Sequence, residues 1–111
     1  MSTAVRIPEP KNWSSQKDAY LYVRRILKKV RNGESLTQAE ITHLWLIDAN
    51  LMNYGHENLA LHVREVYHDL DTPDCQDIIG KLKGLYKVLR NANRRRKAKL
   101  ALKKAGISKA Q

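Results

Sequence analysis

Residues 75–99 read CQDIIGKLKGLYKVLRNANRRRKAK, and the fold that we expect follows mainly from this stretch. Its apolar residues recur every three or four positions, which predicts a helix that buries one narrow stripe. The stripe consists of Cys75, Ile78, Ile79, Leu82, Leu85, Tyr86, Leu89 and Ala92. Beyond Ala92 the stripe stops, although no proline follows and the next glycine is Gly106. We therefore expect the helix to continue to about Ala105, past the part that packs against a core.

The start of this helix is predicted at Thr72-Pro73, because threonine caps helices and proline is favoured at the first helical position. Three shorter helices are predicted before it. The first begins at Ser14 or Ser15, either of which can act as its cap. It stops at Asn32-Gly33, because glycine readily takes the left-handed conformation that follows many helices.

The second helix has the clearest local signal in the chain. Thr37 and Glu40 have the spacing of a capping box, and Leu36 and Ile41 flank them as a hydrophobic staple. Gly55 closes this helix, and a third is predicted from about Glu57 to Leu70. The side chains expected to face inward are Ala19, Tyr22, Val23, Ile26, Leu27 and Val30, then Ile41, Leu44, Trp45, Ile47, Leu51 and Met52, then Leu59, Val63, Val66, Tyr67 and Leu70.

These elements predict an all-α fold: a small four-helix domain with a long basic C-terminal helix extending past the core. A chain of 111 residues fits one such domain. Residues 1–13 are expected to form a flexible arm, residues 14–92 the helical domain and residues 93–111 the basic extension. Trp13 either staples the arm to the domain or stays outside as a contact residue.

Composition favours a cytoplasmic protein, or a nuclear one in a eukaryote. The single Cys75 cannot form an internal disulfide, which favours a reducing compartment. No stretch approaches the roughly 20 apolar residues that span a bilayer. Met1–Pro10 contains no apolar segment of the kind that secretory signals carry.

Charge is distributed in three blocks along the chain. Residues 1–33 hold eight basic and two acidic residues, residues 34–77 hold one basic and nine acidic residues, and residues 78–111 hold twelve basic residues and no acidic one. The blocks sum to a net charge of +10. A basic run of this length repels itself unless a polyanion or an acidic surface neutralises it.

Nucleic acid, either DNA or RNA, is the partner that this pattern favours. Arginine pairs with phosphate through two hydrogen bonds at once, and lysine adds point charge. The binding residues that we expect are Lys83, Lys87, Arg90, Arg94, Arg95, Arg96, Lys97 and Lys99, with Arg24, Arg25, Lys28 and Lys29 as a second contact if the first helix packs beside the fourth. The function would be that of a small regulatory or accessory protein, such as a transcription regulator.

Three other partners remain as alternatives. The basic helix could dock on an acidic protein, making the chain an interaction module or inhibitor. The acidic middle of one copy could pair with the basic helix of another, giving a homodimer. A membrane surface is less favoured, because the extension offers only Leu100, Leu102 and Ile107 for insertion and has no aromatic anchor.

Catalytic, metal and cofactor chemistry are not expected. His43, His56, His62 and His68 do not have the spacing of converging zinc ligands, and no phosphate-binding loop or nucleophile motif is present. Cys75 is expected to be a buried apolar residue rather than a nucleophile. A helix-turn-helix is also disfavoured, since the third helix carries Glu57, Glu65 and Asp69 with only Arg64 opposing them. Trp45 and the tyrosines Tyr20, Tyr22, Tyr54, Tyr67 and Tyr86 could stack on bases if exposed, but most are expected to pack in the core.

Overall fold

The computed structural model describes residues 15–105, which form four helices and no strand. The helices are α1 (Ser15–Arg31), α2 (Gln38–Asn53), α3 (Glu57–Leu70) and α4 (Ile78–Ala105). The expected all-α fold with a long C-terminal helix is therefore confirmed. The expected arm, Trp13, a cap at Ser14 and the residues after Ala105 lie outside the described residues.

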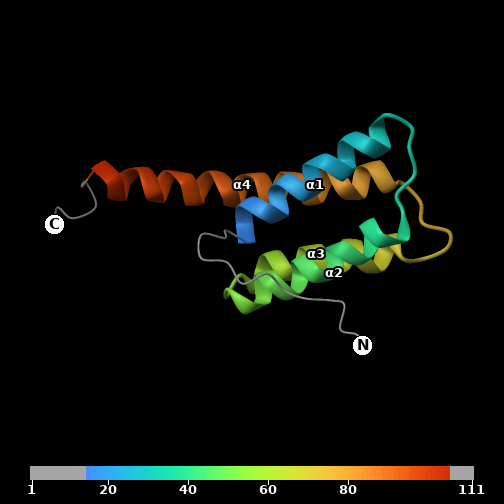
Figure 1. Cartoon of the computed structure of the whole chain (residues 1–111), viewed down its shortest axis with the longest axis horizontal. Helices are drawn as coiled ribbons and strands as arrows, with labels where there is room; N and C mark the ends of the chain where they lie inside the picture. Colours follow the sequence, from blue (N-terminus) through green and yellow to red (C-terminus); the bar gives the residue numbers. More distant parts are fainter. Residues whose placement is uncertain (1–14, 106–111) are drawn as a thin grey trace.

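The helices form two layers of two (Figure 1). α1 packs along α4 and runs in the opposite direction, while α2 and α3 form an antiparallel hairpin. Smaller contacts of α1 with α2 and of α3 with α4 join the layers. The C-terminal part of α4 extends beyond the other three helices, as the end of the apolar stripe predicts.

A single core lies between the layers and takes residues from all four helices. Its largest fully buried side chains are Val23 and Ile26 of α1, Leu44 and Leu51 of α2, Val63 of α3, and Leu82 and Leu89 of α4. Burying one such aliphatic side chain contributes roughly 1.5–3 kcal/mol. Because the chain has no phenylalanine, leucine, isoleucine and valine supply most of this burial.

Both ends of α2 form as the sequence predicts. The Glu40 backbone N–H donates to Thr37 Oγ1 at 3.1 Å, and the Thr37 backbone N–H donates to Glu40 Oε1 at 2.8 Å. At the other end, the His56 N–H donates to the Leu51 carbonyl at 2.8 Å and the Gly55 N–H to the Met52 carbonyl at 3.1 Å. Gly55 has a φ of +81°, which a side chain would strain.

The start of α4 differs from the prediction. Thr72 caps no helix start, because its hydroxyl donates to the His68 carbonyl at 3.0 Å and so completes the end of α3. α4 begins instead at Ile78, where Asp77 Oδ1 accepts a hydrogen bond from the Gly80 N–H at 3.1 Å. A Cβ at position 80 would overlap the Asp77 carboxylate, so any larger residue there would force that side chain out of its capping position.

The buried face of α2 also differs from the prediction. Trp45 and Met52, expected in the core, are 48% and 41% exposed. Asp48 and Asn50 are buried instead. Arg64 of α3 explains Asp48, since its Nε and Nη2 reach the two carboxylate oxygens at 2.9 and 3.1 Å.

Smaller corrections concern the stripe and the tyrosines. Ile79 is 41% exposed rather than buried, and Cys75 lies before α4 and is only partly buried. Tyr54 is 46% exposed, because it follows the last residue of α2 and lies off the core. The other four tyrosines are partly buried and pack against the core.

Candidate nucleic-acid interface

A groove lies where α1 meets α4. Its walls consist of Arg24, Leu27, Lys28, Arg31, Asn32 and Tyr86, and they enclose about 350 Å³. Three of these six residues are cations and none is acidic. The groove exists because α1 packs along α4. This packing was the condition for expecting the basic residues of α1 to form a second contact.

The contacts of Tyr86 show which side of α4 faces this groove. Its ring stacks on Tyr20 of α1, with ring centroids 5.6 Å apart and planes inclined by 26°. The Arg90 guanidinium lies 5.6 Å from the Tyr86 centroid, a cation–π distance. Arg90 therefore lies on the α1 side of α4, next to the groove.

Four more cations of α4 share this side. Positions 83, 87, 90, 94 and 97 follow helical spacing, so their side chains leave α4 in similar directions over about 21 Å of helix. We name the groove cations and this row together the seam surface. Its members are Arg24, Lys28 and Arg31 of α1 and Lys83, Lys87, Arg90, Arg94 and Lys97 of α4, all exposed except the half-buried Arg90.

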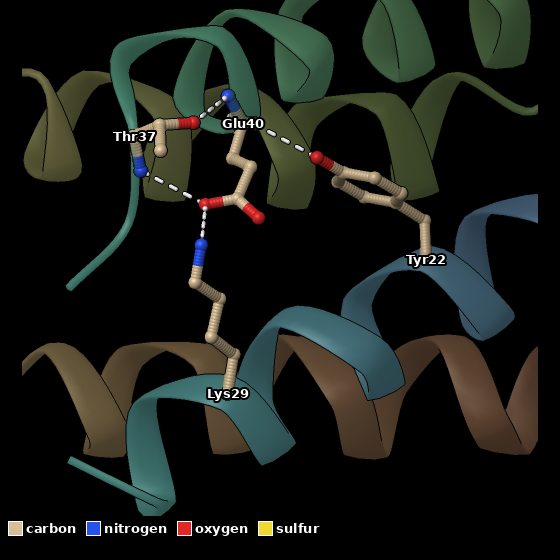
Figure 2. A network of polar contacts seen from close by, with 4 residues as sticks. All are labelled: Tyr22, Lys29, Thr37 and Glu40. Atoms are coloured by element: carbon tan, nitrogen blue, oxygen red, sulfur yellow. Dashed lines mark hydrogen bonds and ion pairs between the residues drawn. The ribbon is translucent and has the colours of Figure 1, made fainter. Parts of the chain in front are cut away.

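The other two predicted cations of α1 lie elsewhere. Lys29 Nζ forms an ion pair with Glu40 Oε1 at 2.7 Å, beside the capping box of α2 (Figure 2). The Tyr22 hydroxyl donates to the Glu40 carbonyl at 3.3 Å, and the Arg25 guanidinium lies 5.2 Å from the Tyr22 ring. Lys29 therefore joins α1 to α2, and Arg25 lies against Tyr22 of its own helix, so neither cation contributes to the seam surface.

The three consecutive arginines of α4 are not equivalent. Arg94 belongs to the seam surface, and Arg95 is exposed on another side of the helix. Arg96 turns back toward the core, where its Nη2 and Nε donate to Oδ1 of the buried Asn93 at 3.0 and 3.3 Å. From Arg94 to Ala105, every residue other than Arg96 is exposed, Lys99 included.

Sequence reasoning did not include Arg31 in the site. It lies three residues after Lys28 and seven after Arg24, so it occupies the same side of α1. That spacing was a usable signal. The packing of α1 on α4 could not be predicted, because no local pattern indicates which helix is the partner of α1.

The histidines do not form a metal site in the part of the chain that the structure describes, since no three His, Cys, Asp or Glu side chains there could hold an ion. Burial lowers the pKa of His43, and the Arg25 charge lowers it further. Burial also lowers the pKa of His56. Between residues 15 and 105, no helix is long and apolar enough to cross a membrane.

Comparisons of the chain with protein-family models, with curated proteins and with solved structures found no match.

Proposed function

We propose that the protein binds nucleic acid, DNA or RNA, through the seam surface and the exposed end of α4, as a small regulatory or accessory protein. The observation that supports this proposal is the gathering of α1 and α4 cations around one groove. The lining residues include no acidic side chain, so nothing within the groove neutralises these charges. A polyanion supplies that neutralisation and releases its own counterions on binding.

The residues of this surface have separate roles in the proposal. Lys83, Lys87 and Arg94 contact phosphates along one strand. Arg24 and Lys28 hold the nucleic-acid backbone at the groove. Among residues 15–105, no other helix lies beside the end of α4. A single helix fits the major groove of B-DNA, about 12 Å wide, or a widened groove in RNA. Phosphate contacts fix the register of the complex without reading its sequence.

A salt titration tests the proposal. If the protein neutralises about six duplex phosphates, a plot of log affinity against log salt has a slope near −5. Replacing Lys83 and Lys87 by glutamine should weaken binding and reduce the magnitude of that slope by about 2.

The matched control is the double variant Arg25→Gln/Lys81→Gln, which loses the same charge. Arg25 lies against Tyr22, and Lys81 lies 3.4 Å from Asp69 on another side of α4. The control should keep the wild-type slope. An affinity insensitive to salt, or equal losses in both variants, would contradict the proposal.

A second candidate is docking of the α4 extension on an acidic protein. Leu100 and Leu102 favour it, because they are 45% and 47% exposed and line an open hollow of about 420 Å³ with three cations of α4. Apolar side chains add nothing to phosphate binding. Recovering the protein from cells with and without nuclease separates the two candidates, since a stoichiometric protein partner survives nuclease and a nucleic acid does not.

A further inference from the structure

The groove between α1 and α4 has more room than phosphate contacts require. Cations that bind phosphates along a strand lie on the protein surface and need no cavity between them. The groove encloses about 350 Å³, which lies within the roughly 300–1,000 Å³ of sites that take a small molecule or cofactor. Its volume therefore suits a compact group that enters between the two helices.

The inner walls of the groove are apolar and fixed in place. Leu27 of α1 is 3% exposed, and Tyr86 of α4 is half-buried. The Tyr86 ring stacks on Tyr20 at 5.6 Å between centroids, and the Arg90 guanidinium lies 5.6 Å from the centre of the Tyr86 ring. Because these neighbours already hold the ring, it loses little side-chain freedom when a ligand binds. An aromatic ligand group can therefore pack here.

The rim of the groove is cationic and polar. Arg24, Lys28 and Arg31 are exposed, and within residues 15–105 none of them forms an ion pair. Arginine binds phosphate through two parallel hydrogen bonds and also stacks on aromatic faces. The exposed Asn32 lines the groove beside them. Its backbone N–H already donates to the carbonyls of Lys28 and Lys29 at 3.1 and 3.2 Å, and its side-chain amide offers a ligand both a donor and an acceptor.

We infer that the groove holds one unpaired nucleotide of the bound strand, an inference that rests on the proposed function. The base enters the groove against Leu27 and Tyr86. Its phosphates lie on the three rim cations, and the Asn32 amide bonds to the polar edge of the base. Bases in a duplex are stacked and paired, whereas bases of single strands, loops and bulges can turn outward into such a site. The favoured ligand is therefore nucleic acid with an unpaired base.

The cations of α4 favour a strand over a free nucleotide. Lys83 lies three residues before Tyr86 and Arg90 four residues after it, so their side chains leave α4 on neighbouring sides. The phosphates before or after the inserted base can therefore continue along α4. A free nucleotide is too short to use this row.

Fluorescence anisotropy on the full chain tests the inference with three probes of equal length, about 12 nucleotides. One is a single strand, one is the same strand in a duplex, and one is a phosphodiester strand without bases. The single strand should bind about tenfold more tightly than the base-free strand, because one stacked base adds about that much. Replacing Lys83 and Lys87 by glutamine should weaken binding of both. Unchanged binding in that variant would indicate a site for a free nucleotide and overturn the inference.

Two matched variants locate the base. Asn32→Leu removes the amide and fills the groove without changing the charge, so the single strand should then bind no more tightly than the base-free strand. Asn53→Leu is the control, since Asn53 is an exposed asparagine at the end of α2 in the other layer. It should keep the preference of about tenfold for the single strand. The thermal midpoint confirms that each variant is folded, and equal behaviour of the two would overturn the inference.

The duplex probe separates this inference from the proposed function. If the base-free strand binds as tightly as the single strand, and the duplex affinity falls with salt, the protein binds phosphates alone. The proposed function then stands and the unpaired nucleotide is overturned. If no probe binds the wild type, both proposals are overturned.

Discussion

The two helical layers share a core but present opposite outer surfaces. α1 and α4 expose cations around a groove, whereas α2 exposes Trp45 and Met52 and neutralises both of its charges. The same core residues support both layers, so core packing does not require this difference. The outward side of each layer is therefore the place to look for a partner, and the two sides suit different partners.

The layers also differ in how they are stabilised. α2 and α3 are held by specific polar contacts, among them the capping box, Asp48–Arg64 and the Gln38–Asp71 hydrogen bond at 3.2 Å. Burial in the shared core stabilises both layers, and α1 and α4 add the Tyr20–Tyr86 stack to it where α2 and α3 add these polar contacts.

The largest expected effect tests whether the two layers share one core. Leu44→Ala in α2 and Leu89→Ala in α4 should each lower the free energy of unfolding by about 2–5 kcal/mol, because both side chains are fully buried. Urea denaturation followed by circular dichroism should show one transition for each variant. Leu100→Ala is the control, and its effect should stay within about 0.5 kcal/mol because Leu100 lies beyond the core. Two separate transitions would show that the layers unfold independently.

A smaller effect tests the polar contacts of the α2–α3 layer. Thr37→Ala removes the side chain that accepts from the Glu40 N–H and should cost about 1 kcal/mol of unfolding free energy. Ser35→Ala, two residues earlier and exposed, should change little. If both variants unfold at the same urea concentration, the capping box does not contribute to stability.

The smallest effect is a pH dependence at the contact between the layers. His43 lies against the Tyr22 ring, 4.2 Å between centroids, and burial holds the pKa of His43 below its ordinary value of 6.5. His43 therefore binds a proton more readily in the unfolded chain than in the folded chain. The stability due to neutral His43 is complete above pH 6.5 and is lost as the pH falls below it. Melting temperatures from pH 8 to 5 should decline less for His43→Gln than for the wild type, and parallel profiles would contradict this assignment.

Local signals predicted the helix ends where the partners are close in sequence. The capping box at Thr37–Glu40 and the turn at Gly55 involve neighbouring residues, and both formed as predicted. The start of α4 was predicted wrongly because Thr72 bonds backward to His68 of α3. Sequence pattern alone does not show which of two adjacent helices a threonine completes.

Elsewhere, contacts between residues far apart in the sequence limited what could be predicted. Trp45 and Met52 were placed in the core because α2 is apolar on several sides, and the choice of buried side depends on Arg64, 16 positions after Asp48. For the candidate site, the row of cations on α4 followed from spacing. The groove could not be predicted from spacing, since it requires α1 to lie on α4 and Tyr86 to stack on Tyr20.

The pairing of α1 with α4 also affects the order in which the chain folds. α2 and α3 are joined by residues 54–56 alone, so their contacts are local and can form early. α1 is synthesised before both, yet its main partner is the last of the four helices to leave the ribosome. We expect the α2–α3 hairpin to form first and Ile26 of α1 to stay exposed until Leu89 has emerged. During synthesis, the layer that contains α1 and α4 is therefore the one that chaperones would have to protect.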